Sequence, residues 1–172
     1  NPSLWSIPLI ALIGLSVVGS LVPQGGTQIG GEINTGDTAW MLTATALVLL
    51  MTPGLSFFYG GMVDRRNVLS TMLQSFIAMG LVSILWVTVG FSLAFGDSLG
   101  GIIGDPRTFF MFRDVGEASH PTLSPTIPLA LFALFQLKFA IITPALITGA
   151  FAERVRFSSY MLFVCLFSVF IY

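Results

Sequence analysis

A lysine between two phenylalanines lies near the middle of a long apolar run. The stretch FQLKF contains Phe135, Gln136, Lys138 and Phe139, inside the apolar segment Thr126–Phe151. In a helix, spacings of three and four residues bring Phe135, Lys138 and Phe139 onto one broad face. A cation beside aromatic rings is typical of cation–π chemistry, in which two phenyl rings gate or desolvate a small cation. The other interpretation is that the rings face lipid or pack in a core, while Gln136 points elsewhere and bonds to another helix.

Lys138 lies too deep in this segment for its charge to reach water. The nearer end is about twelve residues away, roughly 18 Å in a helix, and a lysine side chain extends about 6 Å. A charge at the centre of a bilayer costs on the order of 3 kcal/mol unless it is paired, neutralised or faces a polar cavity. The eight acidic residues of the chain lie in loops or at segment edges. We therefore expect Lys138 to pair outside this chain or with a backbone carbonyl.

The remaining reactive residues do not form a catalytic or metal-binding pattern. His120 is the single histidine and lies in a polar loop, and Cys165 is the single cysteine and lies in an apolar run. The sequence has no Cys/His cluster, no Ser-His-Asp arrangement and no Walker-type loop. It therefore predicts no enzyme active site, no cofactor and no bound metal.

The composition is that of a membrane protein. Of the 172 residues, 55% are hydrophobic and only 9% are charged, whereas globular domains carry about 25% charged residues. The mean hydropathy is +0.91. A net charge of −1 gives no footprint for binding nucleic acid.

Apolar segments of helical length follow one another along the chain. A membrane span needs roughly 20 apolar residues, so the pattern predicts an all-α, polytopic bundle with kinks at Pro53 and Pro144. The first segment, within residues 1–36, is either an extra helix or a signal-peptide remnant, and an outer loop follows it. The last segment is short for a span, so we expect a longer chain. The segments are Leu4–Val22, Thr38–Met62, Val68–Phe95, Thr126–Phe151 and Phe157 to the end.

Basic residues predict the orientation. Two short turns, DRRN at residues 64–67 and ERVR at residues 153–156, each carry two arginines and are separated by two spans. The positive-inside rule places both turns in the cytoplasm, so the acidic loop at residues 97–125 faces outside. The plasma (inner) membrane is the expected location.

Three longer stretches resemble the N-terminal part of the ammonium transporter (Amt/Mep/Rhesus) family. They are GDTAWMLTATALVLLMTPGLSFFYGGMVDRRNVLS at residues 36–70, LWVTVGFSLAFGD at residues 85–97 and GAFAERVRFSS at residues 149–159. The parts MTPGLSFFYGG and AFAERVRFS are specific far beyond a general apolar match. The resemblance covers residues 37–172, which would be the N-terminal part of the family's membrane domain, incomplete at the C-terminus.

The resemblance implies an eleven-helix protomer in a homotrimer, with an ammonium pore through each subunit. The family pattern Phe-Gln-x-x-Phe matches FQLKF, so Phe135 and Phe139 would bind substrate and form the gate rings. The tryptophan, aspartate, histidines and serine of the family's site would follow Tyr172, and His120 does not match a pore histidine. Residues implied to line the pore are Leu55, Phe58, Tyr59 and Gln136.

Lys138 departs from the family pattern, which has an uncharged residue there. An ammonium group beside the gate would act as a pore plug or switch, which favours a non-transporting ammonium sensor coupled to a cytoplasmic signalling module. If Lys138 instead points away from the pore, an ammonium transporter is favoured. In either case the protein lies in membrane lipid. A third, purely structural role is the remaining alternative.

Overall fold

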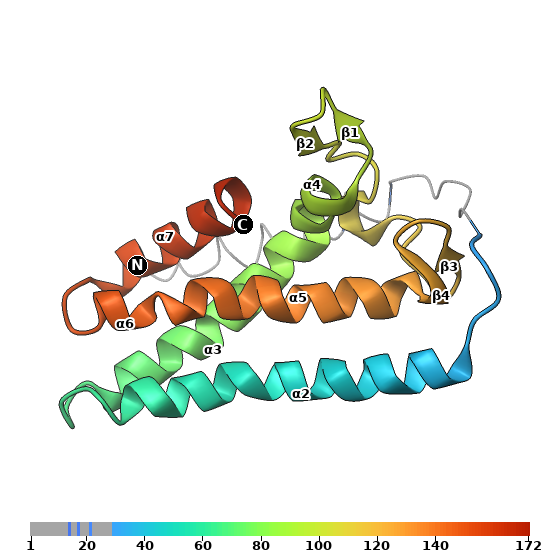
Figure 1. The fold of residues 1–172 in the computed structure, drawn as a ribbon. Coiled ribbons are helices and arrows are strands. Elements are labelled where there is room, and N and C mark those ends of the chain that lie inside the picture. Colours follow the sequence, from blue (N-terminus) through green and yellow to red (C-terminus); the bar gives the residue numbers. More distant parts are fainter. Residues whose placement is uncertain (1–13, 15–16, 18–20, 22–28) are drawn as a thin grey trace.

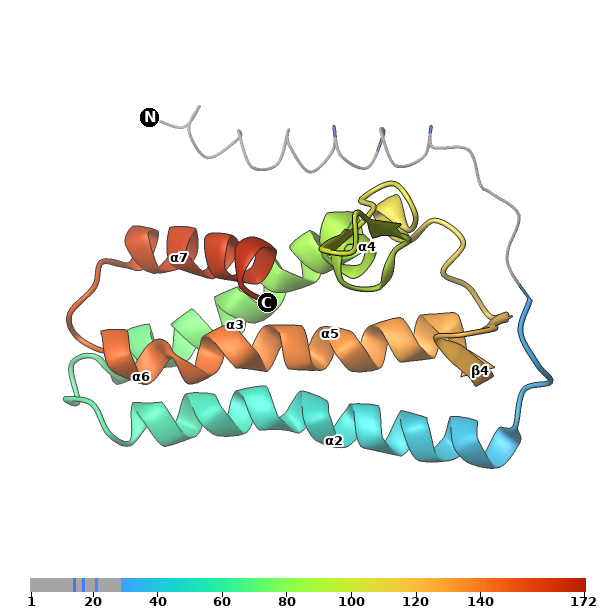
Figure 2. The same cartoon turned by 45° about the horizontal axis from the view of Figure 1, so that its top comes forward.

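The main helices lie side by side and join opposite ends of a bundle (Figure 1, Figure 2). The computed structural model describes residues 14, 17, 21 and 29–172. Helices α2 (Thr35–Gly60) and α5 (Leu129–Leu146) run in one direction, while α3 (Val68–Leu85) and α7 (Phe157–Phe170) return. The predicted segment Leu4–Val22, with its two alternatives, lies outside the described residues except for three positions.

Three helical stretches are long and apolar enough to cross a membrane. They are Thr35–Gly60, Val68–Phe95 and Leu129–Phe151, and α7 is a shorter apolar helix. The predicted all-α, polytopic membrane bundle is confirmed in these helices. The prediction placed the start of the first of them three residues too late. The side chain of Asn34 caps it, accepting from the N–H groups of Gly36 at 2.8 Å and Asp37 at 3.1 Å.

The two prolines inside these stretches have different consequences. α2 continues as one helix through Pro53. α5 ends at Leu146, two residues after Pro144, and the short helix α6 (Thr148–Phe151) follows after Ile147. The N–H that Pro144 lacks would have bonded to the carbonyl of Ala140, one turn before the break, so the loss of this donor does not by itself explain the interruption at Ile147.

A π-helical turn interrupts the second membrane stretch. Trp86–Gly90 (η1) joins α3 to the short helix α4 (Phe91–Phe95). The indole N–H of Trp86 donates to the carbonyl of Ala133 on α5 at 3.1 Å. A Cβ on Gly90 would lie 3.1 Å from the Trp86 ring, so a glycine there leaves room for the indole. The turn thus directs a large side chain across to α5, and such turns are frequent at functional sites.

Two small hairpins lie in the polar stretch that was predicted to be a loop. β1 (Ser98–Leu99) pairs with β2 (Ile103–Gly104), and β3 (Ser119–His120) pairs with β4 (Ser124–Pro128). The 3-10 turn η2 (Phe110–Phe112) lies between the hairpins.

The helix predicted from Thr126 begins only at Leu129. Residues 126–128 belong to β4, and the correction has a physical cause: a residue before proline is held extended, and Pro128 fixes that end of the strand. The N–H of Asn34 donates to the carbonyl of Thr126 at 2.8 Å. The start of α2 is thereby tied to the start of α5.

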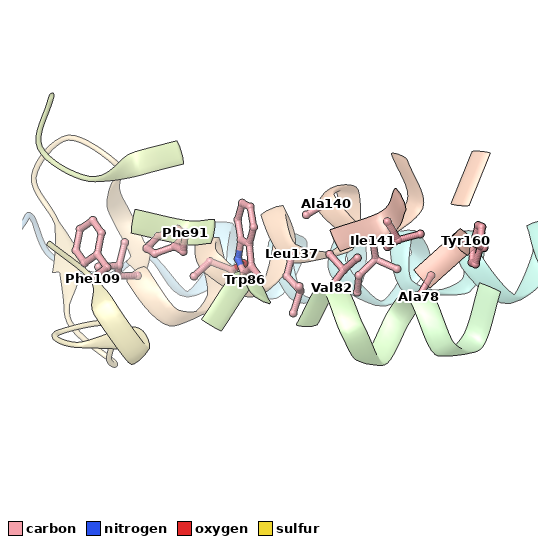
Figure 3. Close-up of a cluster of buried hydrophobic side chains, with 12 residues drawn as sticks. Ala78, Val82, Trp86, Phe91, Phe109, Leu137, Ala140, Ile141 and Tyr160 are labelled. Atoms are coloured by element: carbon pink, nitrogen blue, oxygen red, sulfur yellow. The ribbon is translucent and has the colours of Figure 1, made fainter. Parts of the chain in front are cut away.

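The core runs along the bundle between the second and third membrane stretches and α7. Figure 3 shows its side chains in a row from Phe109 at one end to Tyr160 at the other. In the most apolar part of α2, only 11% of the residues are buried. The same share is 39% in Val68–Phe95 and 44% in Leu129–Phe151. α2 therefore packs at the edge of this bundle. The labelled core residues are Ala78, Val82, Trp86, Phe91, Phe109, Leu137, Ala140, Ile141 and Tyr160.

Candidate functional site

Phe135 and Phe139 form a contacting aromatic pair on α5. Their ring centroids lie 5.1 Å apart with an angle of 69° between the planes, an edge-to-face arrangement. Both side chains are half-buried among the described residues. One helical turn separates them, so the two rings form a continuous aromatic strip along the helix.

Gln136 and Lys138 are the polar residues of the same turn. Both are half-buried, and in the part of the chain that the structure describes neither side chain forms a hydrogen bond or ion pair. In the part of the chain that the structure describes, the ion pair joins Arg113 to Asp114 at 3.6 Å, in the loop before α5. The expectation that Lys138 pairs outside this chain or with a backbone carbonyl stays a prediction.

Leu55, Phe58 and Tyr59 lie in the last turns of α2, near the turn that joins α2 to α3. Phe58 is 61% exposed, whereas Leu55 and Tyr59 are half-buried. The rings of Phe58 and Tyr59 contact each other at 5.5 Å and 62°. These three residues share one broad side of the helix because they are spaced by three and four.

Tyr59 is fixed at the break between α5 and α6. Its hydroxyl donates to the carbonyl of Leu146 at 2.6 Å. A Cβ at Gly149 would lie 2.7 Å from the tyrosine ring, so the ring needs a glycine beside it. Leu146 is seven residues beyond Phe139, about 10 Å along a helix. The structure therefore does not bring the α2 residues into one cluster with the FQLKF residues, and the two groups occupy different levels.

A pocket lies at the loop end of the bundle, away from both groups. It has a volume of about 730 Å³ and is lined by none of the predicted site residues. Its charged lining residues are Asp97, Asp105, Arg107, Arg113 and Asp114, together with His120.

His120, which the sequence places in a polar loop, is half-buried. Its Nδ1 accepts from the N–H of Leu123 at 3.3 Å, and its ring contacts Phe109 edge to face at 6.1 Å. The hairpin β3–β4 creates this arrangement, and no periodicity in the sequence indicates it.

The two basic turns lie at one end of the bundle, as predicted from the segment order (Figure 1). Oε1 of Glu153 accepts from the N–H of Asp64 at 2.8 Å and from the amide of Asn67 at 3.1 Å. The Asn67 side chain, and then the Asp64 N–H, hold the pKa of Glu153 below its ordinary value, against the smaller opposing effects of burial and of the Asp64 charge. Glu153 is thus the charged acceptor that joins the turns.

The antiparallel bundle, with three helices able to span a membrane, defines a polytopic integral membrane protein. A model of the Ammonium Transporter Family matches residues 39–172, and the chain belongs to this family. The family is one of transporters, in agreement with the prediction that the chain is not an enzyme.

Relatives and solved structures agree on this assignment. A protein from Methanothermobacter thermautotrophicus is 50% identical over 141 residues, which is 81% of this chain and 34% of the relative. The ammonium transporter of Mycobacterium tuberculosis is 46% identical over 157 residues, 84% of this chain and 33% of the relative. The crystal structure of Candida albicans Mep2 is similar with a TM-score of 0.66 and 31% identity, over 79% of this chain and 29% of that chain. The chain spans about a third of the length of the relatives it matches.

Proposed function

We propose that this protein carries ammonium or ammonia across a membrane through an apolar passage that runs beside Phe135 and Phe139. The observation that carries the proposal is membership of the Ammonium Transporter Family. The contacting aromatic pair on α5 supports it, since by the resemblance these rings would occupy the family's Phe-Gln-x-x-Phe positions. A ring face attracts a cation within about 6 Å, with a free energy of about 0.5 to 2 kcal/mol. Ammonium is recruited in this way, and the apolar passage then requires that it lose its water or its proton.

The contact between the two rings limits how they act. Their centroids are 5.1 Å apart, so a cation does not fit between them without a change of rotamer. The substrate would pass along the strip instead, with one ring offering its face and the other its edge. Gln136 would add a polar group in the same turn. Leu55, Phe58 and Tyr59 would line the passage near its cytoplasmic end.

The assembly and orientation follow from the family resemblance and the arginines. We infer a homotrimer of eleven-helix protomers, of which residues 37–172 form the first part. Residues 64–67 and 153–156 face the cytoplasm at the plasma (inner) membrane, supported by four arginines at this end of the bundle. A cysteine introduced at Arg65, in the full-length protein from which Cys165 and every other native cysteine have been removed, would react with an impermeant maleimide only in inside-out vesicles. Reaction in right-side-out vesicles would reverse the orientation.

A non-transporting ammonium sensor is the second candidate, and Lys138 favours it. Its ammonium group has no ion pair among the described residues and lies one residue from Phe139. Such a group would compete with substrate for the aromatic strip. A sensor would also need a cytoplasmic signalling partner or module.

The test is uptake of radiolabelled methylammonium into cells that lack their own ammonium transporters, expressing the full-length protein. Transport predicts saturable uptake that unlabelled ammonium inhibits. An inactive protein that reaches the membrane and still binds ammonium would overturn the transport proposal in favour of the sensor.

A further inference from the structure

The charged pocket at the loop end of the bundle has a fixed floor. The N–H of Phe109 donates at 3.0 Å to the hydroxyl of Ser92, which is fully buried on α4. At the base of hairpin β1–β2, the N–H of Asp105 donates to the carbonyl of Asp97 at 2.6 Å. The N–H of Asp97 donates in turn to the hydroxyl of Thr108 at 3.1 Å. These bonds hold the lining backbone in place before any ligand binds, which lowers the cost of binding one.

Another part of the pocket wall is built on unusual backbone. Phe112 and Asp114 have φ angles of 57° and 58°, in the left-handed region that residues other than glycine seldom adopt. Such residues persist where the surrounding structure holds them, and they cluster at ligand-binding sites. Arg113 lies between them, and both Arg113 and Asp114 line the pocket.

The pairing of the charged lining residues leaves groups of both signs available. Nε of Arg113 lies 3.6 Å from Oδ2 of Asp114, so these two charges offset each other. Oδ1 of Asp105 accepts from the backbone N–H of Arg107 at 2.8 Å, which leaves the guanidinium group of Arg107 unused. Within the described ranges, neither this guanidinium group nor the carboxylate of Asp97 forms a hydrogen bond or an ion pair. Two carboxylates and one guanidinium group therefore remain for a ligand.

A simple ion does not match this set of groups. A cation would be opposed by Arg107, and an anion by Asp97 and Asp105. The volume of about 730 Å³ is far larger than an ion and lies in the usual range for small-molecule sites, about 300 to 1,000 Å³. A molecule with one charge of each sign does match, because a guanidinium group binds a carboxylate through two parallel N–H donors and a carboxylate accepts from an ammonium group. Phe95 and Phe109 add apolar surface to the same pocket.

We propose that this pocket binds a zwitterionic α-amino acid. Arg107 binds the α-carboxylate, Asp97 and Asp105 bind the α-ammonium group, and Phe95 contacts the side chain of the ligand. The pocket and the two basic turns lie at opposite ends of the bundle (Figure 1), so the amino acid binds from outside when those turns face the cytoplasm. None of the residues proposed to line the ammonium passage lines this pocket. The binding therefore does not depend on ammonium transport.

Thermal unfolding of the full-length, detergent-solubilised protein tests the ligand class, because a ligand that binds the folded state raises the melting temperature. The probes are the twenty common L-amino acids, each at about 10 mM, a concentration that detects millimolar binding. For every amino acid that raises the melting temperature, the N-acetyl derivative, which lacks the ammonium group, and the amide, which lacks the carboxylate, are measured beside it. We expect at least one amino acid to stabilise the protein and both of its derivatives to have no effect. No shift with any of the twenty, or an equal shift with either derivative, would overturn the proposal.

Variants of the pocket test its location. Arg107→Gln and Asp97→Asn each remove one charge and keep a polar side chain, and we expect each to weaken the affinity for the stabilising amino acid at least about tenfold, as for the loss of a hydrogen bond to a charged group. Arg65→Gln is the matched control, because it removes an exposed arginine at the opposite end of the bundle. Unchanged affinity in both pocket variants, or an equal loss in the control, would overturn the proposal. Methylammonium uptake by Arg107→Gln is expected to equal that of the wild type, so a failure of this proposal is separate from a failure of the transport proposal.

Discussion

The hydroxyl of Tyr59 and the carbonyl of Leu146 are joined by a hydrogen bond of 2.6 Å, across 87 residues of sequence. The bond connects the last turn of α2 to the end of α5, where helix carbonyls lack intrahelical donors. It fixes α2, the least buried of the spanning helices, against the bundle. Tyr59 therefore has a structural role in addition to its proposed place in the pore lining.

Tyr59→Phe removes this bond and keeps the ring. We expect a loss of about 0.5 to 1.5 kcal/mol in unfolding free energy, the usual contribution of one hydrogen bond. Thermal unfolding of the detergent-solubilised protein measures it. Phe57→Leu is the control, because Phe57 is 66% exposed on the same helix. A stability loss in the control equal to that of Tyr59→Phe would assign the effect to the surroundings of the helix end and not to the bond.

A second hydrogen bond joins α6 to α7 inside the core. The hydroxyls of Thr148 and Tyr160 lie 3.0 Å apart, and both residues are fully buried. We expect the double-mutant cycle of Thr148→Val and Tyr160→Phe to give a coupling of about 0.6 kcal/mol, and no more than about 1.7, as measured for side-chain hydrogen bonds between membrane helices. Additive single effects would mean that the bond contributes nothing.

Apolar segment length predicted the helices well, because membrane spans need long apolar runs. Val68–Phe95 is predicted and observed as one helical stretch. Its π-helical turn was not predicted, since that turn accompanies a bond between Trp86 and Ala133, 47 residues apart. The strand at residues 124–128 was also not predicted, for a different reason. Its apolar residues continue into α5, and only the backbone restriction at Pro128 separates the two elements.

Local spacing also predicted part of the candidate site. The contact between Phe135 and Phe139 follows from their spacing of four residues. The links from Tyr59 to Leu146 and from Glu153 to Asp64 join segments distant in sequence, and no local pattern contains them. The common end of the two basic turns was nevertheless predictable, because two spans separate them.

Phe135→Leu and Phe139→Leu test the aromatic strip. Leucine keeps an apolar side chain but lacks the ring face, so each substitution removes a cation–π attraction of about 0.5 to 2 kcal/mol. We expect the methylammonium concentration that gives half-maximal uptake to rise about two- to thirtyfold. Phe163→Leu is the matched control, because its ring contacts Phe151 and Phe167 and not the strip. Uptake by both strip variants that matches the control would remove these rings from the substrate path.

Glu153 predicts a pH dependence of stability. Its pKa in the folded protein lies below the ordinary value of 4.5. A carboxylate with a lowered pKa contributes stability above its unfolded-state pKa and loses it as the pH falls through the folded-state value. We expect the wild type to exceed Glu153→Gln in melting temperature at neutral pH, and the difference to shrink on acidification below pH 4.5. A constant difference across this range would contradict the assignment.

Lys138→Met distinguishes transport from sensing. If the lysine lies outside the pore line, replacing it with an apolar residue of similar length leaves methylammonium uptake within about twofold of the wild type, because no barrier to the substrate changes. If its ammonium group occupies the substrate path, the wild type is inactive and the methionine variant gains uptake. Flux into proteoliposomes made with the full-length protein measures both cases.

Lys138→Arg is the matched control, since it keeps the positive charge that methionine removes. An electrostatic plug predicts no uptake by the wild type or the arginine variant, and uptake by the methionine variant alone. Equal uptake by all three proteins places the charge away from the substrate. In that case Lys138 needs a partner elsewhere, because an unpaired charge at this depth costs on the order of 3 kcal/mol. An inactive wild type with an active Lys138→Met would contradict the transport proposal and leave the sensor as the function of this protein.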